Sequence, residues 1–198
     1  MAFTLQPGDK AIPFALPATD GKTYGLDQFK DKQVLVVVFT CNHCPHAIGT
    51  EDRMIAFHNE YGPKGVGMIS INSNESKGHP DDSFDKMVIR ARQKGFGFPY
   101  AHDESQEVAL AYGALRTPHF YVFDANRALV YTGRMDDNTL DASLAKTREL
   151  RDAVDAVLAN RPAQTALTNP IGCTVKWKDR NGAPWAPPEA CDLVPQSA

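Results

Sequence analysis

An uninterrupted apolar run, Val34-Leu-Val-Val-Val-Phe39, leads directly into the segment Thr-Cys-Asn-His-Cys-Pro at residues 40–45. A run with no polar break predicts a strand that is buried on both faces of a central sheet. Pro45 is typical of the first turn of a helix, where its missing N–H is not needed. The sequence therefore predicts a buried strand followed by a helix, with two cysteines at the junction.

These two cysteines, Cys41 and Cys44, are three residues apart. On the first turn of a helix they would share one face and could close a small disulfide ring. A helix N-terminus lowers the pKa of a thiol there, and the thiolate is the reactive nucleophile. The pattern predicts a redox-active dithiol. The alternative, a closed zinc site, needs a second ligand pair at suitable spacing, and Cys173 and Cys191, eighteen residues apart, do not supply one.

The overall composition limits the partners that we expect. The chain has 198 residues and a formal charge of −3, without a basic block, so nucleic acid and anionic membranes are not expected partners. Its longest apolar run is far shorter than the roughly 20 residues that span a bilayer. Residues 1–10 contain no apolar signal region, so we expect a cytoplasmic location. There, four cysteines favour catalysis or metal binding over structural disulfides.

Periodicity and turn signals predict the remaining elements. A hairpin is expected around Asp20-Gly21. Further strands are expected at 66–71, 98–101, 119–124 and 128–132, and helices at 45–61, 81–94, 105–112 and 140–158. Their order describes a central mixed sheet with helices on both faces. We divide the chain into a domain at 1–160 and a proline-rich extension at 161–198 that is expected to pack on it.

Three segments together resemble the redoxin type of thioredoxin-fold protein, which includes thiol–disulfide oxidoreductases and relatives of the AhpC/TSA peroxiredoxins. They are Phe14-Ala-Leu-Pro17 with Asp20-Gly-Lys22, the segment 34–45, and Arg116-Thr-Pro-His-Phe-Tyr-Val-Phe-Asp124. The resemblance covers roughly residues 5–160 and implies an α/β thioredoxin-like fold with an N-terminal β-hairpin. It also implies thiol–disulfide exchange with protein or small-molecule thiols and disulfides, with no cofactor beyond the cysteine pair.

The resemblance implies roles for the residues of the motif. Cys41 would attack a substrate disulfide, and Cys44 would resolve the mixed disulfide. His43 would stabilise the reduced thiolate and so make the couple more oxidising. Asn42 and Thr40, which flank Cys41, are expected to contribute to substrate binding.

Pro118 is expected to follow a cis peptide bond, as it does in thioredoxin-like proteins. X-Pro bonds adopt this form at a cost of only about 0.5–1 kcal/mol. The backbone of Thr117 would then be exposed beside the sulfurs, where an extended substrate segment could add strand-like hydrogen bonds. The alternative is a trans proline that merely opens an edge strand.

The chain departs from the family pattern in ways that leave alternatives open. Thioredoxins carry Trp where this chain has Thr40, and many bury an acid in the preceding strand, for which Glu51, Asp52 or solvent could substitute here. The peroxiredoxin motif Pro-x-x-x-Thr-x-x-Cys is not met, although Cys44-Pro45 matches its Cys-Pro step. A thiol-dependent peroxidase is therefore the alternative function, with Arg116 near the position of a peroxide-activating arginine.

The remaining cysteines and histidines allow further interpretations. Cys173 is either a small buried hydrophobe, a second redox partner of Cys191, or a thiol that relays electrons to Cys41 and Cys44. The segment 172–178 could add an edge strand or cover the core with Trp177. A metal-binding module is the alternative from another class, using scattered histidines with the dithiol, although no metal is expected. Its candidate ligands are His46, His79, His102 and His119.

Overall fold

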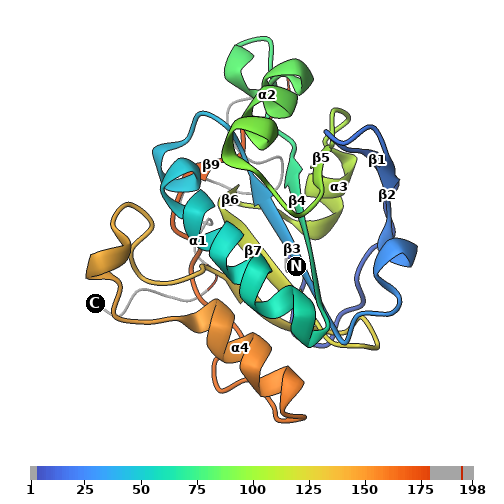
Figure 1. Ribbon diagram of the computed structural model, residues 1–198, viewed down its shortest axis with the longest axis vertical. Helices are drawn as coiled ribbons and strands as arrows, with labels where there is room; N and C mark the ends of the chain where they lie inside the picture. The colour runs from blue at the N-terminus through green and yellow to red at the C-terminus, as the bar shows by residue number, and fades with distance from the viewer. Residues whose placement is uncertain (1–3, 179–192, 194–198) are drawn as a thin grey trace.

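The computed structural model describes residues 4–178 and residue 193, and its centre is a five-stranded mixed sheet in the order β5-β4-β3-β7-β8. These strands are β3 (Val34–Thr40), β4 (Val66–Asn72), β5 (Tyr100–His102), β7 (His119–Phe123) and β8 (Leu129–Gly133). β3, β4 and β5 run parallel, whereas β7 and β8 pair antiparallel with their neighbours. The strand predicted at 34–40 is thus the central strand, as Figure 1 shows.

Alternate residues of β3 supply the two halves of the core. Val34, Val36 and Val38 pack against α1 (Pro45–Tyr61) and α4 (Glu149–Leu158) on one face. Leu35, Val37 and Phe39 pack on the other face, against α3 (Glu107–Tyr112) and the N-terminal segment. Because both faces are covered, every residue of β3 is buried. The expected thioredoxin-like α/β fold, with helices on both faces, is confirmed.

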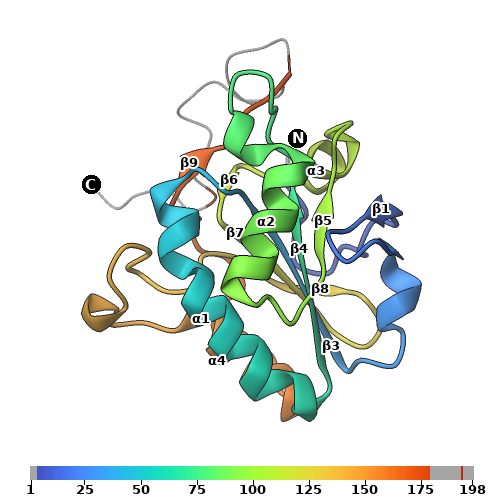
Figure 2. The ribbon, with the colours of Figure 1, turned by 45° about the horizontal axis from the view of Figure 1, so that its top comes forward.

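The edges of the sheet carry the smaller elements. The N-terminal hairpin consists of β1 (Leu16–Pro17) and β2 (Thr23–Tyr24), two residues each, and is shorter than predicted. A bridge between Ala18 and Ala101 places this hairpin beside β5. α2 (Phe84–Lys94) packs near β5 on the same side as α1, to which the ion pair of Arg90 with Glu51 (2.6 Å) ties it (Figure 2).

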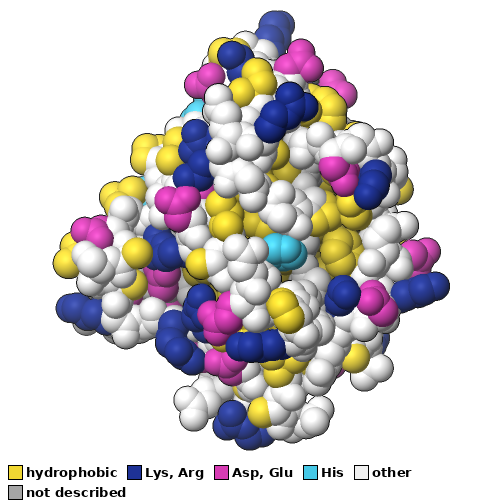
Figure 3. Space-filling model, in the orientation of Figure 1, with side chains coloured by type: hydrophobic (Ala, Val, Ile, Leu, Met, Phe, Trp, Pro, Cys, Tyr) yellow, Lys and Arg dark blue, Asp and Glu magenta, His cyan; other side chains and the backbone are white. Residues whose placement is uncertain are grey.

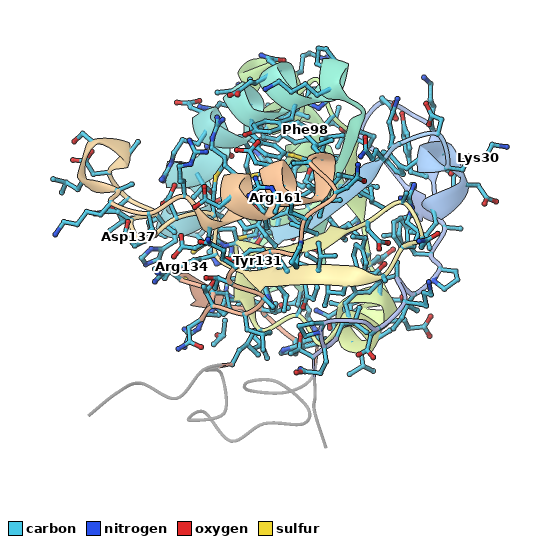
Figure 4. The ribbon with its side chains drawn as sticks, turned by 90° about the horizontal axis from the view of Figure 1, so that it is seen from below. Lys30, Phe98, Tyr131, Arg134, Asp137 and Arg161 are labelled. Carbon is cyan, nitrogen blue, oxygen red and sulfur yellow. The ribbon has the colours of Figure 1, made fainter. Side chains whose placement is uncertain are left out.

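The helix predicted at 140–158 is wrong at its start. α4 begins only at Glu149, and a 3-10 turn at Ala142–Leu144 precedes it. The guanidinium of Arg53 on α1 takes the carbonyl oxygens of Asn138 and Thr139, both at 2.8 Å, and holds this stretch as a loop. In Figure 4 this loop, marked by the Asp137 label, projects away from the sheet.

Beyond residue 160 the chain runs back over the sheet. Leu167 forms a bridge with Thr132 of β8. Further on, β9 (Cys173–Thr174) pairs antiparallel with β6 (Arg116–Thr117), and Val175 and Trp177 are buried in the core half that contains Leu35. Residues 161–178 thus contribute a strand and core side chains, while the division of the chain at residue 160 stays a prediction.

Among the described residues, none of the helices has both the length and the apolar character needed to cross a bilayer. On the face that Figure 3 shows, positive and negative side chains are interspersed. This mixed pattern is ordinary for a protein surface and identifies no charged docking face.

Candidate active site

The dithiol lies where β3 ends and α1 begins. Cys41 follows the last residue of β3, and Cys44 is the N-cap residue of α1, directly before Pro45. Their exposed fractions are only 2% and 0%. The sulfurs lie in one small cluster with Ala47 and the partly buried Cys173. Cys44 thus stands at the tip of α1 as expected, and both cysteines are shielded from water.

Both sulfurs face the segment that contains Pro118. The Thr117–Pro118 peptide bond is cis, as the resemblance implied. The hydroxyl of Thr117 lies 3.2 Å from the Cys41 sulfur, and its carbonyl oxygen lies 3.4 Å from the Cys44 sulfur, as acceptor when that thiol is protonated. Thr117 of β6 therefore places one polar atom against each of the two cysteine sulfurs.

The surroundings shift the pKa values of the two cysteines in opposite directions. The pKa of Cys44 is lowered by the hydrogen bond from the Cys41 thiol, and further by hydrogen bonds from the Cys173 thiol and from the backbone N–H groups of Ala47 and Cys173. The pKa of Cys41 is raised by that same bond to Cys44, by burial, and by the negative charge of Asp82. Of the two thiols, Cys44 has the lowered pKa and Cys41 the raised one, and the roles of attacking and resolving thiol that the resemblance gives to Cys41 and Cys44 stay a prediction.

Asp82 is the buried acid of the site, and its side chain is 0% exposed. One carboxylate oxygen accepts from the backbone N–H of Asn42 (2.6 Å) and the amide of Asn72 (3.1 Å). The other accepts from the amide of Asn74 (3.0 Å) and lies 2.5 Å from Nδ1 of His43. These donors compensate for the removal of the carboxylate from water.

Asp82 stands directly before the N-cap of α2 and does not cap that helix. Ser83 is the N-cap residue of α2, and the Asp82 side chain points to the dithiol loop instead. The other candidate acids are held elsewhere. Glu51 receives two hydrogen bonds from Arg90 (2.9 and 2.6 Å), and Asp52 is 83% exposed and pairs with Lys94.

His43 is held between Asp82 and a second imidazole. Its ring stacks on that of His79 at 4.8 Å between centroids, and its side chain is 23% exposed. The loop at 72–80 therefore supplies both His79 and amide donors to the site, and it does form a wall beside the dithiol. His43 is not the freely exposed loop histidine that the sequence left open.

Asn42 has internal hydrogen-bond partners, and Thr40 is buried. The side chain of Asn42 accepts from the hydroxyl of Tyr100 (2.9 Å) and donates to the carbonyl of Asp81 (2.7 Å). Thr40 is the last residue of β3 and is 4% exposed. Both residues point into the protein, where they support the loop that carries Cys41 and Cys44 and do not face a substrate.

One group of possible metal ligands occurs in the described part of the chain. Ligand atoms of Cys41, His43 and Asp82 lie within 4.8 Å of one another. The carboxylate of Asp82 is already occupied by the four donors described above. Of the candidate histidines, His119 is fully buried and bonds to Thr132 (2.9 Å), whereas the His46 ring bonds to Thr139 (2.6 Å).

The edge beside Pro118 is not open to an incoming strand. Thr117 pairs with Cys173 and Arg116 with Thr174, so the chain's own β9 takes this edge. The expected exposure of the Thr117 backbone is therefore wrong, and Thr117 is 2% exposed. Cys191, the other possible secondary redox residue, lies outside the described residues.

Comparisons with known proteins agree with this geometry. The family model described as Redoxin matches residues 6–148. Thiol-disulfide oxidoreductase ResA of Halalkalibacterium halodurans is 26% identical over 136 residues, which cover 68% of this chain and 73% of ResA. A peroxiredoxin-like protein of Mycobacterium tuberculosis is 27% identical over 120 residues, which cover 59% of this chain and 69% of that protein.

A solved structure is more similar over the whole chain. An uncharacterised protein from Geobacillus kaustophilus is 39% identical and superposes with a TM-score of 0.82, covering 91% of this chain and 95% of that one. The family model itself spans well over half of the 198 residues. Together with the sheet order, the cis-proline and the paired cysteines, this match shows that the chain belongs to the redoxin family of oxidoreductases.

Proposed function

We propose that this protein is a thiol–disulfide oxidoreductase that works through Cys41 and Cys44, without a cofactor beyond the cysteine pair. The observation that carries the proposal is that both sulfurs lie in one cluster and contact Thr117, directly before cis-Pro118. Two thiols that meet in this way at the N-terminus of a helix are placed to form a disulfide. Thiols and disulfides of proteins or small molecules are the corresponding substrates.

The unequal pKa values suggest the order of the steps. The Cys44 thiolate attacks one sulfur of a disulfide, whose other sulfur leaves with the bonding electron pair and takes up a proton. Cys41 then attacks Cys44, releases the second substrate thiol and closes the Cys41–Cys44 disulfide. Two electrons pass from the cysteine pair to the substrate, together with the proton of Cys41 and one proton from solvent, and the reverse sequence oxidises a substrate dithiol.

The test is a redox titration against glutathione, followed by reduction of an insulin disulfide. We expect a Cys41→Ser or Cys44→Ser chain to lose turnover. Full disulfide-reductase activity in either variant would rule out the proposal. The measured potential gives the direction, since a value near about −270 mV is typical of a reductant and one near about −120 mV of an oxidant.

A thiol-dependent peroxidase is the second candidate. The low pKa of Cys44 and the Cys44-Pro45 step favour it, and so does the peroxiredoxin-like relative. Against it, Arg116 donates to the carbonyl of Gly172 (3.0 Å) rather than lying free for a peroxide. Stopped-flow mixing with hydrogen peroxide separates the two functions, because fast sulfenic acid formation at Cys44 is required only of a peroxidase.

A further inference from the structure

The strand that covers the dithiol has the features of a bound substrate. An extended segment, residues 172–175, pairs antiparallel with the residues that precede the cis-proline, and it places a cysteine opposite Thr117. The N–H of Val175 extends the pairing to the carbonyl of Leu115 at 3.3 Å. This is the strand-addition mode by which an external peptide would bind such an edge, yet the peptide is a part of the same chain.

The close fit of this segment depends on a glycine. A Cβ atom at position 172 would lie 2.1 Å from the carbonyl oxygen of Thr117 and 3.1 Å from the nitrogen of Pro118. Only glycine lets the backbone approach the cis-proline so closely. The carbonyl of Gly172 is fixed in turn by Arg116, so the residue before Cys173 is held from both sides.

Downstream of Cys173 the segment is anchored on the wall of the site. Lys176 donates its N–H to the side chain of Asn74 (2.9 Å), and its carbonyl accepts from Gln106 (2.8 Å) and from the N–H of Glu75 (2.8 Å). Val175 and Trp177 on either side are 2% and 7% exposed. The thiol of Cys173 is therefore presented to the dithiol by an ordered strand.

The three sulfurs differ in their access to solvent. Cys41 and Cys44 are buried, whereas Cys173 is partly exposed and packs against both. Its thiol and backbone help to lower the pKa of the Cys44 sulfur, against which it packs. An external disulfide thus meets Cys173 first, and Cys173 already contacts the sulfur that we assign as the thiolate.

We propose that Cys173 is the entry thiol of the site and that a Cys44–Cys173 disulfide is an intermediate of its reaction. This proposal rests on the thiol–disulfide exchange proposed above, and it makes residues 171–178 an internal substrate of the dithiol. The segment also excludes external peptides from the edge of β6, so low-molecular-weight disulfides are the substrates that the closed site accepts.

The reaction balances without any further reagent. Burial and the Cys44 sulfur raise the pKa of Cys173 to about 11, so its thiol gives up its proton as its sulfur attacks the external disulfide. The first substrate thiol leaves with the electron pair and with that proton. The Cys44 thiolate attacks the Cys173 sulfur and displaces the second substrate thiol. Cys41 then attacks Cys44, and Cys173 leaves as a thiol with the proton of Cys41. The Thr117 hydroxyl, 3.2 Å from the Cys41 sulfur, stays beside the new Cys41–Cys44 bond.

The first test traps the intermediate. In a chain with Cys41→Ser and Cys191→Ser, only Cys44 and Cys173 remain, and it is treated with glutathione disulfide. We expect one internal disulfide, found by mass spectrometry as tryptic peptide 33–53 linked to peptide 152–176. The matched control moves the thiol by one residue, with Thr174→Cys added and Cys173→Ser, and it should not form the link. Only glutathione adducts in the first chain, or equal linkage in both, would overturn the proposal.

The second test measures the relay itself. We expect Cys173→Ser to slow oxidation of the dithiol by glutathione disulfide roughly tenfold or more relative to Cys191→Ser, because a bound thiol acts at high effective concentration. Equal rates in these two chains would remove the relay but leave the dithiol chemistry standing. If instead Cys191→Ser forms no Cys41–Cys44 disulfide, the exchange reaction itself is wrong.

Discussion

At the scale of single residues, the site depends on a charge that is remote in sequence. Asp82 is buried close to Cys41, and its charge raises the pKa of that thiol while its hydrogen bonds hold Asn42 and His43. The charge of Asp82 therefore disfavours a thiolate at Cys41. Asp82 acts on the chemistry through this field and not by contact with a substrate.

The effect of Asp82 on Cys41 can be measured directly. In a Cys44→Ser chain, Asp82→Asn should lower the pKa of Cys41 by roughly one unit, because a nearby like charge is removed. The observable is the pH dependence of iodoacetamide alkylation at Cys41, read by mass spectrometry. Asp81→Asn is the control, since Asp81 is exposed. An identical pH profile with and without Asp82→Asn would contradict the assigned role.

His119 should make the protein less stable in mild acid. Burial, aided by the nearby positive charge of Arg116, lowers its pKa from 6.5 to about 3. The unfolded chain therefore binds a proton between these pH values that the folded chain does not, and stability falls as the pH drops below about 6.5. From pH 7 to pH 5 the contribution of this one group is a loss of about 2 kcal/mol.

The variant that tests this prediction is His119→Gln, because its amide can keep a hydrogen bond to Thr132 but cannot take up a proton. Urea unfolding at pH 7 and pH 5 should show a smaller acid loss in the variant, by about 2 kcal/mol. His58 and His102, whose pKa values are also lowered by burial, are present in both chains and cancel. Equal acid sensitivity of the two proteins would show that His119 accepts a proton while folded.

At the scale of elements, strands and helices with strong local patterns were predicted well. β3 and α1 have the predicted bounds, because an apolar run and a proline after a cysteine pair are local signals. The loop at 140–148 was predicted as helix, since nothing near it in sequence reveals Arg53, the residue that binds its carbonyls. Leu140 and Leu144, which lie in this loop, are 62% and 60% exposed.

The candidate site was predictable only in part, for the same reason. The cysteine pair and Pro118 follow from short motifs. The Asp82 network joins residues from β4, the loop at 72–80 and the dithiol loop, and no local pattern distinguishes Asp82 from its neighbour Asp81. The pairing of Thr117 with Cys173 joins two strands of two residues each, too short for periodicity to reveal which edge they occupy.

The pairing of β9 with β6 should depend on position 172. Gly172→Ala places a methyl group against the carbonyl of Thr117 and should separate the two strands. We expect the dithiol to become accessible, with alkylation by iodoacetamide at pH 7 at least roughly tenfold faster, because local opening controls the reaction of buried groups. Thr174→Ala keeps the backbone pairing and is the control. Unchanged alkylation in Gly172→Ala would mean that β9 does not limit access.

At the scale of the whole molecule, the C-terminal residues complete the core. Trp177 and Val175 pack in the half of the core that also holds Phe39 and Tyr112. We expect Trp177→Ala to lower the free energy of unfolding by about 3 kcal/mol, as large-to-small changes in a core do. Ile89→Ala, at a residue 46% exposed, should change it by less than about 0.5 kcal/mol. Urea denaturation measures both, and similar values for the two variants would show that residues 171–178 add little to the fold.

The position of Trp177, four residues after Cys173 on the same anchored segment, has a practical consequence. Any movement that withdraws this segment from the sulfurs also transfers an indole from an apolar setting into water. The emission of that native fluorophore should therefore report, in real time and without a label, when the redox centre opens.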